Sequence, residues 1–432
     1  MTHSSPNSPL DNRSSLAAPG SGTVVLLAAL YCAQGLPSGL IAHALPILMR
    51  QNGVDLVAIG MLKLLALPWV LKVIWAPWVD RLASARWGHH RGWILPLQAT
   101  VLTVLIVIAS LPPQDLFGAY LPVLLGLLLV VNLAAATQDV ATDGLAVKLL
   151  PERWRGLGNS LQVGGYKVGM IVSGSMLLLV VERWGWGASM GMVAALVGLT
   201  TLPVLLFPEK RRLPRMPALA EPAGPHLLWR HYRGFLALPA MGSWLAVVLA
   251  FKIGDAIGSP MIKPLLVDLG WSSMALGRLT LVSSLVGVGG AVLGGALYAR
   301  LGAQRSLLLF GFLQALGIAA MAWLARSGGD APVVYAIALF EQVADGMSTV
   351  ALFAMMMNQC RPEHEGADFT LQACSQVVLA GVIGSLSGMV AKRLGYEGHF
   401  LLAGLLGLLA LALVVLYFAK RPAATPPPFA EQ

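Results

Sequence analysis

The sequence predicts an all-α polytopic membrane protein with twelve transmembrane helices in two six-helix bundles. The first reason is composition: 57% of the 432 residues are hydrophobic and only 11% are charged, whereas a soluble chain would carry roughly a quarter charged residues. The second is that apolar runs of about 20 residues, each long enough to cross the hydrocarbon core as a helix, recur along the chain. The third is a long polar interruption, 208–236, that separates six such runs from six others.

The expected elements, in chain order, are a tail, a bundle, a linker, a second bundle and a second tail. Residues 1–22 are rich in Ser, Pro and Asn and are expected to form a disordered cytoplasmic tail. The N-terminal bundle is expected at 23–207, the cytoplasmic linker at 208–236, the C-terminal bundle at 237–419 and the last tail at 420–432. The twelve spans are expected at 23–49, 56–79, 93–111, 117–149, 157–181, 186–207, 237–267, 273–299, 304–325, 331–359, 367–392 and 397–419.

The basic residues indicate the orientation of the chain. A net charge of +9 would also suit a nucleic-acid partner, but the cations lie in short loops between spans, as the positive-inside rule requires, so no nucleic acid is expected. The linker and the other even-numbered loops hold most of them: Lys210, Arg211, Arg212, Arg215, Arg230, Arg233, Arg81, Arg86, Arg91, Arg153, Arg155, Arg300, Arg305 and Arg361. Both termini are therefore expected on the cytoplasmic side.

Several function classes find no support in the sequence. The three cysteines, Cys32, Cys360 and Cys374, lie in or at the ends of apolar runs without metal-ligand spacing, so no disulfide framework, metal site or other cofactor is expected. No phosphate-binding Gly-x-x-x-x-Gly-Lys-Ser/Thr loop is present, which argues against ATP hydrolysis. No nucleophile with a base, or cluster of metal ligands, is visible, so we expect a protein that is not an enzyme. A membrane-embedded enzyme and a non-transporting sensor stay open as alternatives.

The two halves of the sequence resemble each other. Pro46-Ile-Leu-Met-Arg-Gln-Asn-Gly53 with Gly60 matches Pro264-Leu-Leu-Val-Asp-Leu-Gly270 with Gly277. Pro151-Glu-Arg-Trp-Arg-Gly156 leading to Gln162 matches Pro362-Glu-His-Glu-Gly366 leading to Gln372. A parallel repeat of six spans predicts two bundles around a cavity, with the substrate site between them near the membrane midplane.

Ionisable residues inside apolar runs indicate the candidate site, because a buried charge in a bilayer costs several kcal/mol unless it is paired, protonated or hydrated. Asp139 and Asp143 are four residues apart and share a helix face. They form either a static cluster with Lys167 or part of a proton or substrate site. Glu341 and Asp345 are also four apart with no cation nearby in the sequence, which favours proton transfer, with Asp345 the stronger candidate.

The remaining polar residues within spans allow simpler interpretations. Lys252 and Asp255 are three apart and are expected to pair with each other, while Lys72 and Arg278 lie near span ends and are expected to snorkel. His43 has either a structural role or a role in gating. The proton-coupling candidates are Asp345, Glu341, Asp143 and Asp139, and the substrate-binding candidates are His43, Gln34, Lys167, Tyr166, Gln162, Lys252, Asp255, Arg278, Gln372 and Gln376.

Two loops carry a further motif. The loop after the second span reads Trp75-Ala-Pro-Trp-Val-Asp80-Arg81 and continues to Arg91-Gly92, and the loop after the eighth reads Gly294-Gly-Ala-Leu-Tyr-Ala-Arg300-Leu-Gly302. With the six-plus-six repeat, these motifs resemble the major facilitator superfamily. The resemblance implies a cytoplasmic gate at Asp80, Arg81, Arg91 and Arg300, although Ala299 replaces the second Asp. It also implies that spans 3, 6, 9 and 12 face lipid, and these contain no internal ionisable residues.

The N-terminal third carries a narrower resemblance. Tyr31-Cys-Ala-Gln-Gly-Leu-Pro-Ser-Gly39 and Ala136-Thr-Gln-Asp-Val-Ala-Thr-Asp143 resemble the AmpG-related branch, while Arg155-Gly-Leu-Gly-Asn159 and Gln162-Val-Gly-Gly-Tyr166 look closer to the RhtX/FptX-type siderophore permeases. This implies a monomeric bacterial inner-membrane importer that takes a ferric siderophore, such as a pyochelin-like chelate, from periplasm to cytoplasm with protons. Muropeptide import stays open as the alternative, because muropeptides are also anionic and charge therefore does not distinguish the two solutes.

Overall fold

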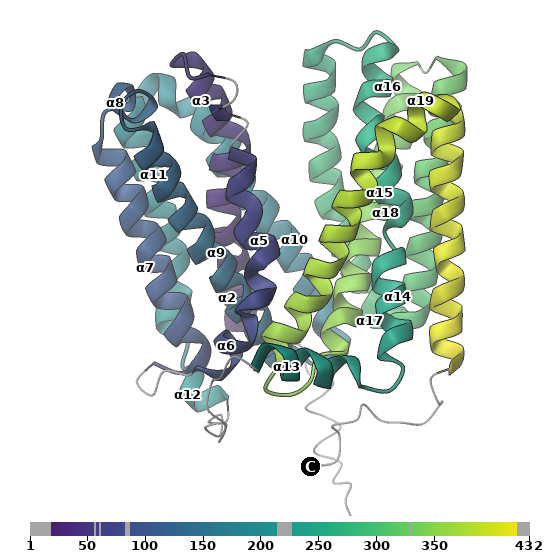
Figure 1. Cartoon of the computed structure of the whole chain (residues 1–432), viewed down its shortest axis with the longest axis horizontal. Coiled ribbons are helices and arrows are strands. Elements are labelled where there is room, and N and C mark those ends of the chain that lie inside the picture. Colours follow the sequence, from purple (N-terminus) through teal and green to yellow (C-terminus); the bar gives the residue numbers. More distant parts are fainter. Residues whose placement is uncertain are drawn as a thin grey trace, which may run out of the picture.

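The computed structural model describes residues 19–55, 58–59, 62–82, 87–213, 227–328 and 330–420. Most of the two expected tails, the loop residue Arg86 and the middle of the linker with Arg215 lie outside these residues. Within them the chain is helical almost throughout. The expected all-α fold with two bundles of membrane-spanning helices is confirmed (Figure 1).

The described residues cross the membrane twelve times, judged by helix length and composition. Eight helices are long and apolar enough to span, and the shorter apolar helix Leu64–Ile74 adds another pass. Three of the eight supply two passes each, because the chain reverses within them. The segment made of α10 and α11 (Leu177–Leu206) reverses at Gly185, α17 (Ser273–Ser327) reverses at Gly302, and α19 (Glu365–Lys420) reverses at Gly395. Each of these glycines has a positive φ, a backbone conformation that a side chain would strain.

The N-terminal bundle contains the elements up to α12. Its segments are α2 (Ser21–Gly39), η1 (Leu40–Ala44), α3 (Leu45–Gln51), η2 (Leu62–Ala66), α5 (Leu67–Leu71), η3 (Lys72–Ile74), α6 (Ala76–Arg81), α7 (His89–Ser110), α8 (Pro113–Phe117), α9 (Leu121–Leu149), η4 (Glu152–Trp154), α10 (Arg155–Ile171), η5 (Val172–Met176), α11 and α12 (Glu209–Arg212). The first span, which contains Pro37, becomes a π-helix at η1, and η1 packs on the second π-helix, η5.

The C-terminal bundle follows the linker helix α13 (Leu227–Leu236). Its segments are α14 (Met241–Ala250), α15 (Ile253–Gly258), η6 (Ser259–Met261), α16 (Ile262–Asp268), α17, α18 (Ala331–Asn358) and α19. The seventh span is therefore broken into the short helical pieces α14, α15, η6 and α16.

The outer faces of the bundles are apolar. Ile106 on α7 is 53% exposed, Leu199 on α11 is 59% exposed and Leu409 on α19 is 58% exposed. These residues lie on the third, sixth and twelfth passes, which the sequence assigns to the lipid face. Large apolar side chains exposed on the outer faces of helices are expected where lipid, rather than water, is the solvent.

The bundles converge at one end, which we call the linker end because α12 and α13 lie there, and their ribbons diverge toward α3 and α16 (Figure 1). One apolar cluster joins them at the linker end: Leu27, Ala146 and Leu150 pack with Trp244, Met356 and Phe369. A methyl group on Gly295 of α17 would lie 2.7 Å from the Gly156 carbonyl oxygen of α10, so these two helices meet through their backbones. The linker end is closed.

Hydrogen bonds between the bundles gather at the same end. The Arg155 guanidinium donates to the Met357 carbonyl at 3.0 Å and to Asn358 Oδ1 at 2.8 Å. Ser160 Oγ donates to the Ala291 carbonyl at 2.7 Å. The linker helix adds a contact with each bundle: Tyr232 donates to the Val73 carbonyl, and His231 bonds Asp368 at 3.1 Å.

Candidate functional site

Among the described residues, a lysine–aspartate ion pair lies within each bundle. In the N-terminal bundle, Lys72 on η3 bonds Asp139 on α9, and their side chains are 7% and 8% exposed. In the C-terminal bundle, Lys252 Nζ lies 2.7 Å from Asp345 Oδ1 and 2.8 Å from Ser348 Oγ. Removing one partner of such an ion pair destabilises the protein strongly, because the charge of the other partner is left uncompensated inside the bundle.

These pairs correct three expectations from the sequence. Lys72 does not snorkel, because its 3-10 segment turns the side chain inward to Asp139. Lys252 pairs with Asp345 rather than with Asp255, so Asp345 is not the carboxylate without a cation. Helical spacing shows which residues share a face, but it does not show which neighbouring helix that face meets.

Lys167 is also placed differently from the expectation. A methyl group on Gly287 would lie 3.2 Å from Lys167 Nζ, so Lys167 reaches across from α10 to α17 of the other bundle. It therefore makes no cluster with Asp139. Its ammonium instead lies close to the part of the C-terminal bundle that holds Gln342 and Asp345.

The second carboxylate of each bundle is held by neutral groups. Asp143 is 1% exposed and accepts hydrogen bonds from Tyr31 Oη at 3.1 Å and Gln162 Nε2 at 3.3 Å. Glu341 is also 1% exposed; its Oε2 accepts from Gln342 Nε2 at 2.8 Å, and its Oε1 has no hydrogen-bond partner among the described residues. Such a carboxylate pays a large desolvation cost when ionised. Glu341, rather than Asp345, matches the expected carboxylate without a cation.

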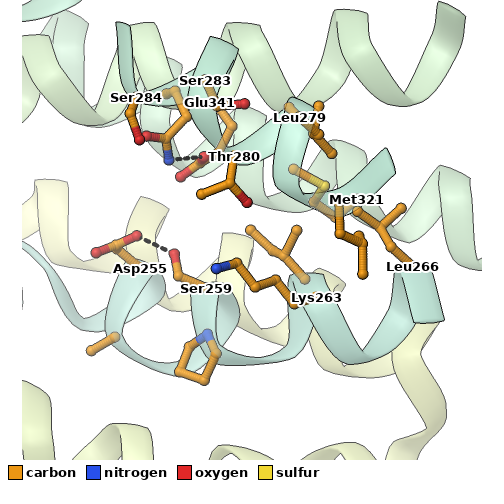
Figure 2. A pocket seen from close by; sticks show the side chains of 16 residues that line it. Asp255, Ser259, Lys263, Leu266, Leu279, Thr280, Ser283, Ser284, Met321 and Glu341 are labelled. Atoms are coloured by element: carbon orange, nitrogen blue, oxygen red, sulfur yellow. Dashed lines mark hydrogen bonds between the residues drawn. The ribbon is translucent and has the colours of Figure 1, made fainter. Parts of the chain in front are cut away.

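A pocket of about 580 Å³ opens beside Glu341 in the C-terminal bundle. It lies between α15 and α16, the first pass of α17, and α18, and Figure 2 shows its lining. Lys263 reaches into it between Ser259 and Thr280. Asp255 accepts a hydrogen bond from Ser259 Oγ at 2.5 Å, and Leu266, Leu279 and Met321 form an apolar side. We call this space the C-terminal pocket.

Sequence reasoning placed Lys263 within the seventh span but did not count it, or the hydroxyl groups around it, among the site candidates. A signal was present, because Asp255, Ser259 and Lys263 follow one another at four-residue spacing and so share one helix face. Thr280, Ser283 and Ser284 repeat at three and four residues on the next span. Two polar stripes within apolar runs predict a shared polar space between the helices that carry them.

The other substrate-binding candidates are scattered. Gln372 is fully buried among the helices of the C-terminal bundle, where its side chain accepts a hydrogen bond from Trp244 Nε1 at 2.6 Å and donates to the carbonyls of Met356 and Asp368. Gln34 is 3% exposed and its Nε2 has no partner among the described residues. The rest lie apart from the C-terminal pocket: His43 is exposed on η1, Tyr166 is half-buried on α10, Gln376 is half-buried on α19, and Arg278 is exposed on α17.

Of the four gate candidates, Asp80 makes the hydrogen bond between bundles. Its Oδ2 accepts from the Ala367 main-chain N–H at 2.7 Å, at the first turn of α19. Arg91 stays within its own bundle, donating to the Leu205 carbonyl at 3.0 Å. Arg81 Nε and Nη1 have no hydrogen-bond partner in the described part of the chain, and Arg300 is exposed. Lys148, which the sequence reasoning missed, pairs with Glu365 across the bundles at 3.5 Å.

Comparisons with known proteins agree with this architecture. The family model described as Major Facilitator Superfamily matches residues 27–385. The anhydromuropeptide permease of Escherichia coli K12 is 28% identical over 382 residues, which covers 87% of this chain and 76% of that protein. A putative AmpG transporter of Rickettsia conorii is 24% identical over 394 residues, covering 88% of this chain and 93% of its own.

Solved structures share the fold. A bacterial homologue of the iron transporter ferroportin in an outward-facing state aligns with a TM-score of 0.68 at 13% identity, over 92% of this chain and 99% of that one. The fucose:proton symporter of Escherichia coli aligns with a TM-score of 0.68 at 12% identity, over 93% and 99%. At these identities the likeness concerns the fold alone.

The expectation of ferric siderophore import is wrong. Relatives that match most of the chain include an anhydromuropeptide permease and a putative AmpG transporter. The motifs that suggested a siderophore lie in the N-terminal third, where they do not touch the C-terminal pocket. Loop and helix-packing glycines preserve the scaffold and do not report which solute is carried.

Proposed function

Because the chain belongs to the major facilitator superfamily, we propose that it is a secondary transporter that carries an anhydromuropeptide across the bacterial inner membrane into the cytoplasm. The observation that supports this solute is the similarity to the Escherichia coli anhydromuropeptide permease, which extends through both bundles. A likeness limited to one bundle would describe only a common scaffold. The solute is moved unchanged, without a catalytic step.

The closed linker end supports a direction of transport. We assign this end and both termini to the cytoplasm, since the arginine-rich loops gather there. In the conformation described, solute would then enter from the periplasmic side, where the bundles diverge (Figure 1). Release requires the contacts around Gly156, Gly295 and Asp80 to open, which is the rocking motion of alternating access. One chain holds both bundles, so we propose a monomer as the working unit.

We further propose that proton entry drives the import. A buried carboxyl group without a cation can hold a proton in one conformation and release it in another. Glu341 satisfies this condition at the wall of the C-terminal pocket, and Asp143 is its counterpart in the N-terminal bundle. Asp139 and Asp345 are less suited, because each already has a lysine.

The test is uptake into proteoliposomes that contain the purified full chain. A labelled anhydromuropeptide is expected to accumulate when an inward proton gradient is imposed, and chromatography of the contents is expected to return the unmodified compound. Protein-free liposomes provide the control for leakage. Absence of protein-dependent uptake would refute the solute, whereas uptake that ignores the proton gradient would refute the coupling alone.

A further inference from the structure

We propose that the C-terminal pocket binds a carboxylate group of the transported solute on Lys263, with Glu341 in its protonated form as a neighbouring hydrogen-bond donor. The inference rests on the proposed function for the identity of the solute, since the peptide of a muropeptide ends in carboxylates. The site itself is argued from the pocket.

Among the residues that line the C-terminal pocket, Lys263 supplies the positive charge for a ligand. Lys72 and Lys252 are each neutralised by an aspartate, whereas Lys263 is exposed and forms no ion pair with another described residue. Figure 2 shows its side chain directed into the pocket. A carboxylate in the pocket would accept the charge-assisted hydrogen bonds that this ammonium group donates.

The other charges of the pocket explain why a proton is needed with the anion. With Asp255 and Glu341 both ionised, the pocket lining would hold two negative charges against the single positive charge of Lys263. An anionic ligand would then be repelled. A proton on Glu341 removes one negative charge and, when it sits on the unpartnered Oε1, turns that oxygen into a hydrogen-bond donor. Ligand and proton therefore favour each other, and this coupling is reciprocal.

The surroundings of Glu341 on each packed element are consistent with a single exchangeable proton. Its own helix presents Asp345, which is held by Lys252. From α17 it faces the backbone at Gly317 and hydroxyl groups rather than charged groups. The remaining titratable groups on this side are Asp255 on α15, Lys263 on α16 and, from the other bundle, Lys167 on α10.

The rest of the lining specifies an organic ligand rather than a small inorganic ion. Thr280, Ser283 and Ser284 line the same part of the pocket as Glu341, and Ser283 Oγ is buried without a hydrogen-bond partner among the described residues. The apolar side suits the carbon skeleton of an amino-acid residue. A volume of about 580 Å³ lies within the range of small-molecule sites.

The first test measures protection of Lys263 in the purified full chain. An amine-reactive reagent modifies exposed lysines, and mass spectrometry reports the extent at Lys263 and at the exposed control Lys392. N-acetylalanine is expected to slow modification of Lys263 and not of Lys392, while its carboxamide has no effect. Equal protection by acid and amide, or none by the acid, would overturn the subsite.

The second test measures binding of the proposed solute by calorimetry. An anhydromuropeptide with free peptide carboxylates is expected to bind Lys263→Gln about tenfold more weakly than wild type, as loss of one charge-assisted contact predicts. The amidated muropeptide should bind both proteins alike, Lys263→Arg should restore binding, and Lys392→Gln should change nothing. Wild-type binding should weaken as pH rises, and Glu341→Gln should remove that dependence.

The two tests separate the two proposals. Protection of Lys263 by N-acetylalanine without muropeptide binding would leave the subsite standing and refute the solute. Muropeptide binding that is unaffected by Lys263→Gln and by amidation would refute the subsite and leave the solute standing. A pH dependence that persists in Glu341→Gln would refute the part assigned to Glu341.

Discussion

Asp80 accepts a hydrogen bond at 2.7 Å from the main-chain N–H of Ala367, which lies 287 residues later in the chain and in the other bundle. Ala367 is in the first turn of α19, where main-chain N–H groups lack a helical partner and the helix dipole favours a negative charge. The two elements are also closely packed at this point, since a methyl group on Gly366 would lie 2.6 Å from Asp80 Oδ1. One carboxylate thus caps a helix of the opposite bundle and holds the linker end closed.

Replacement of Asp80 by Ala is expected to shift the protein toward the conformation open at the linker end. The cap contributes about 1–2 kcal/mol, which exists only while the bundles are closed. Spin labels at position 153 on η4 and position 300 on α17, in opposite bundles of a cysteine-free background, should report a longer distance in a larger fraction of molecules. Asp80→Asn keeps the acceptor oxygen and should shift the population less. An unchanged distance distribution in Asp80→Ala would contradict the role of the cap.

Gly295→Ala is expected to act in the same direction for a steric reason. The added methyl group would lie 2.7 Å from the Gly156 carbonyl oxygen, so α10 and α17 could no longer meet through their backbones. Gly289 lies on the same helix, and a methyl group there would meet nothing within 4 Å, which makes Gly289→Ala the matched control. The same pair of spin labels should separate in Gly295→Ala and stay as in wild type in Gly289→Ala. Separation in both variants would indicate a general loss of helix packing.

The fold could be predicted because lipid imposes simple rules on the sequence. Twelve apolar runs, the six-plus-six division and the lipid-facing passes without charge all follow from helix length and hydrophobicity. The details that the sequence left open are local. The span expected at 117–149 becomes helical at Leu121, because the short helix α8 ends at Phe117 before α9 begins. The residues expected to form the linker, 208–236, include helix α13, which is docked on both bundles.

The site could be predicted only in part, because partners on different helices are not encoded by spacing. The four carboxylates were found from their placement in apolar runs, but Lys72 and Lys252 were given the wrong roles. Lys263 was not selected as a candidate, because nothing in its sequence spacing shows that it faces a pocket. Its position in a pocket depends on the breaks in the seventh span, which bring α15 and α16 against α17.

The Lys72–Asp139 pair is expected to behave as a unit. Asp139→Asn leaves a buried lysine without a counter-ion and should lower the free energy of unfolding by about 3–5 kcal/mol, as should Lys72→Met. The double variant removes both charges and should recover most of that loss. Thermal unfolding of the purified proteins in detergent measures all three. Additive losses in the double variant would show that the two side chains stabilise the bundle independently.

His364, in the loop before α19, is expected to make the linker end sensitive to acid. Burial, with His231 and Arg361 nearby, lowers the pKa of His364 from 6.5 to about 4. The unfolded chain therefore binds a proton that the folded chain does not between these two values, so stability contributed by this group falls as pH drops from about 6.5 toward 4. His364→Gln should show a smaller loss of thermal stability over that range. An identical pH profile would contradict a buried neutral His364.

Glu341→Gln is expected to separate solute exchange from proton-driven accumulation. The amide keeps the size of the side chain and its contact with Gln342, but it holds no exchangeable proton. Exchange of labelled for unlabelled anhydromuropeptide at equal concentrations should stay within about twofold of wild type, whereas accumulation under a proton gradient should be lost.

Asp143→Asn should lower the rate of uptake and leave accumulation possible, because Tyr31 and Gln162 already stabilise Asp143 through neutral hydrogen bonds. Glu397→Gln, at a half-exposed carboxylate outside the pocket, serves as the control. Full accumulation by Glu341→Gln would move the proton site elsewhere, and Asp143 would be the first position to examine.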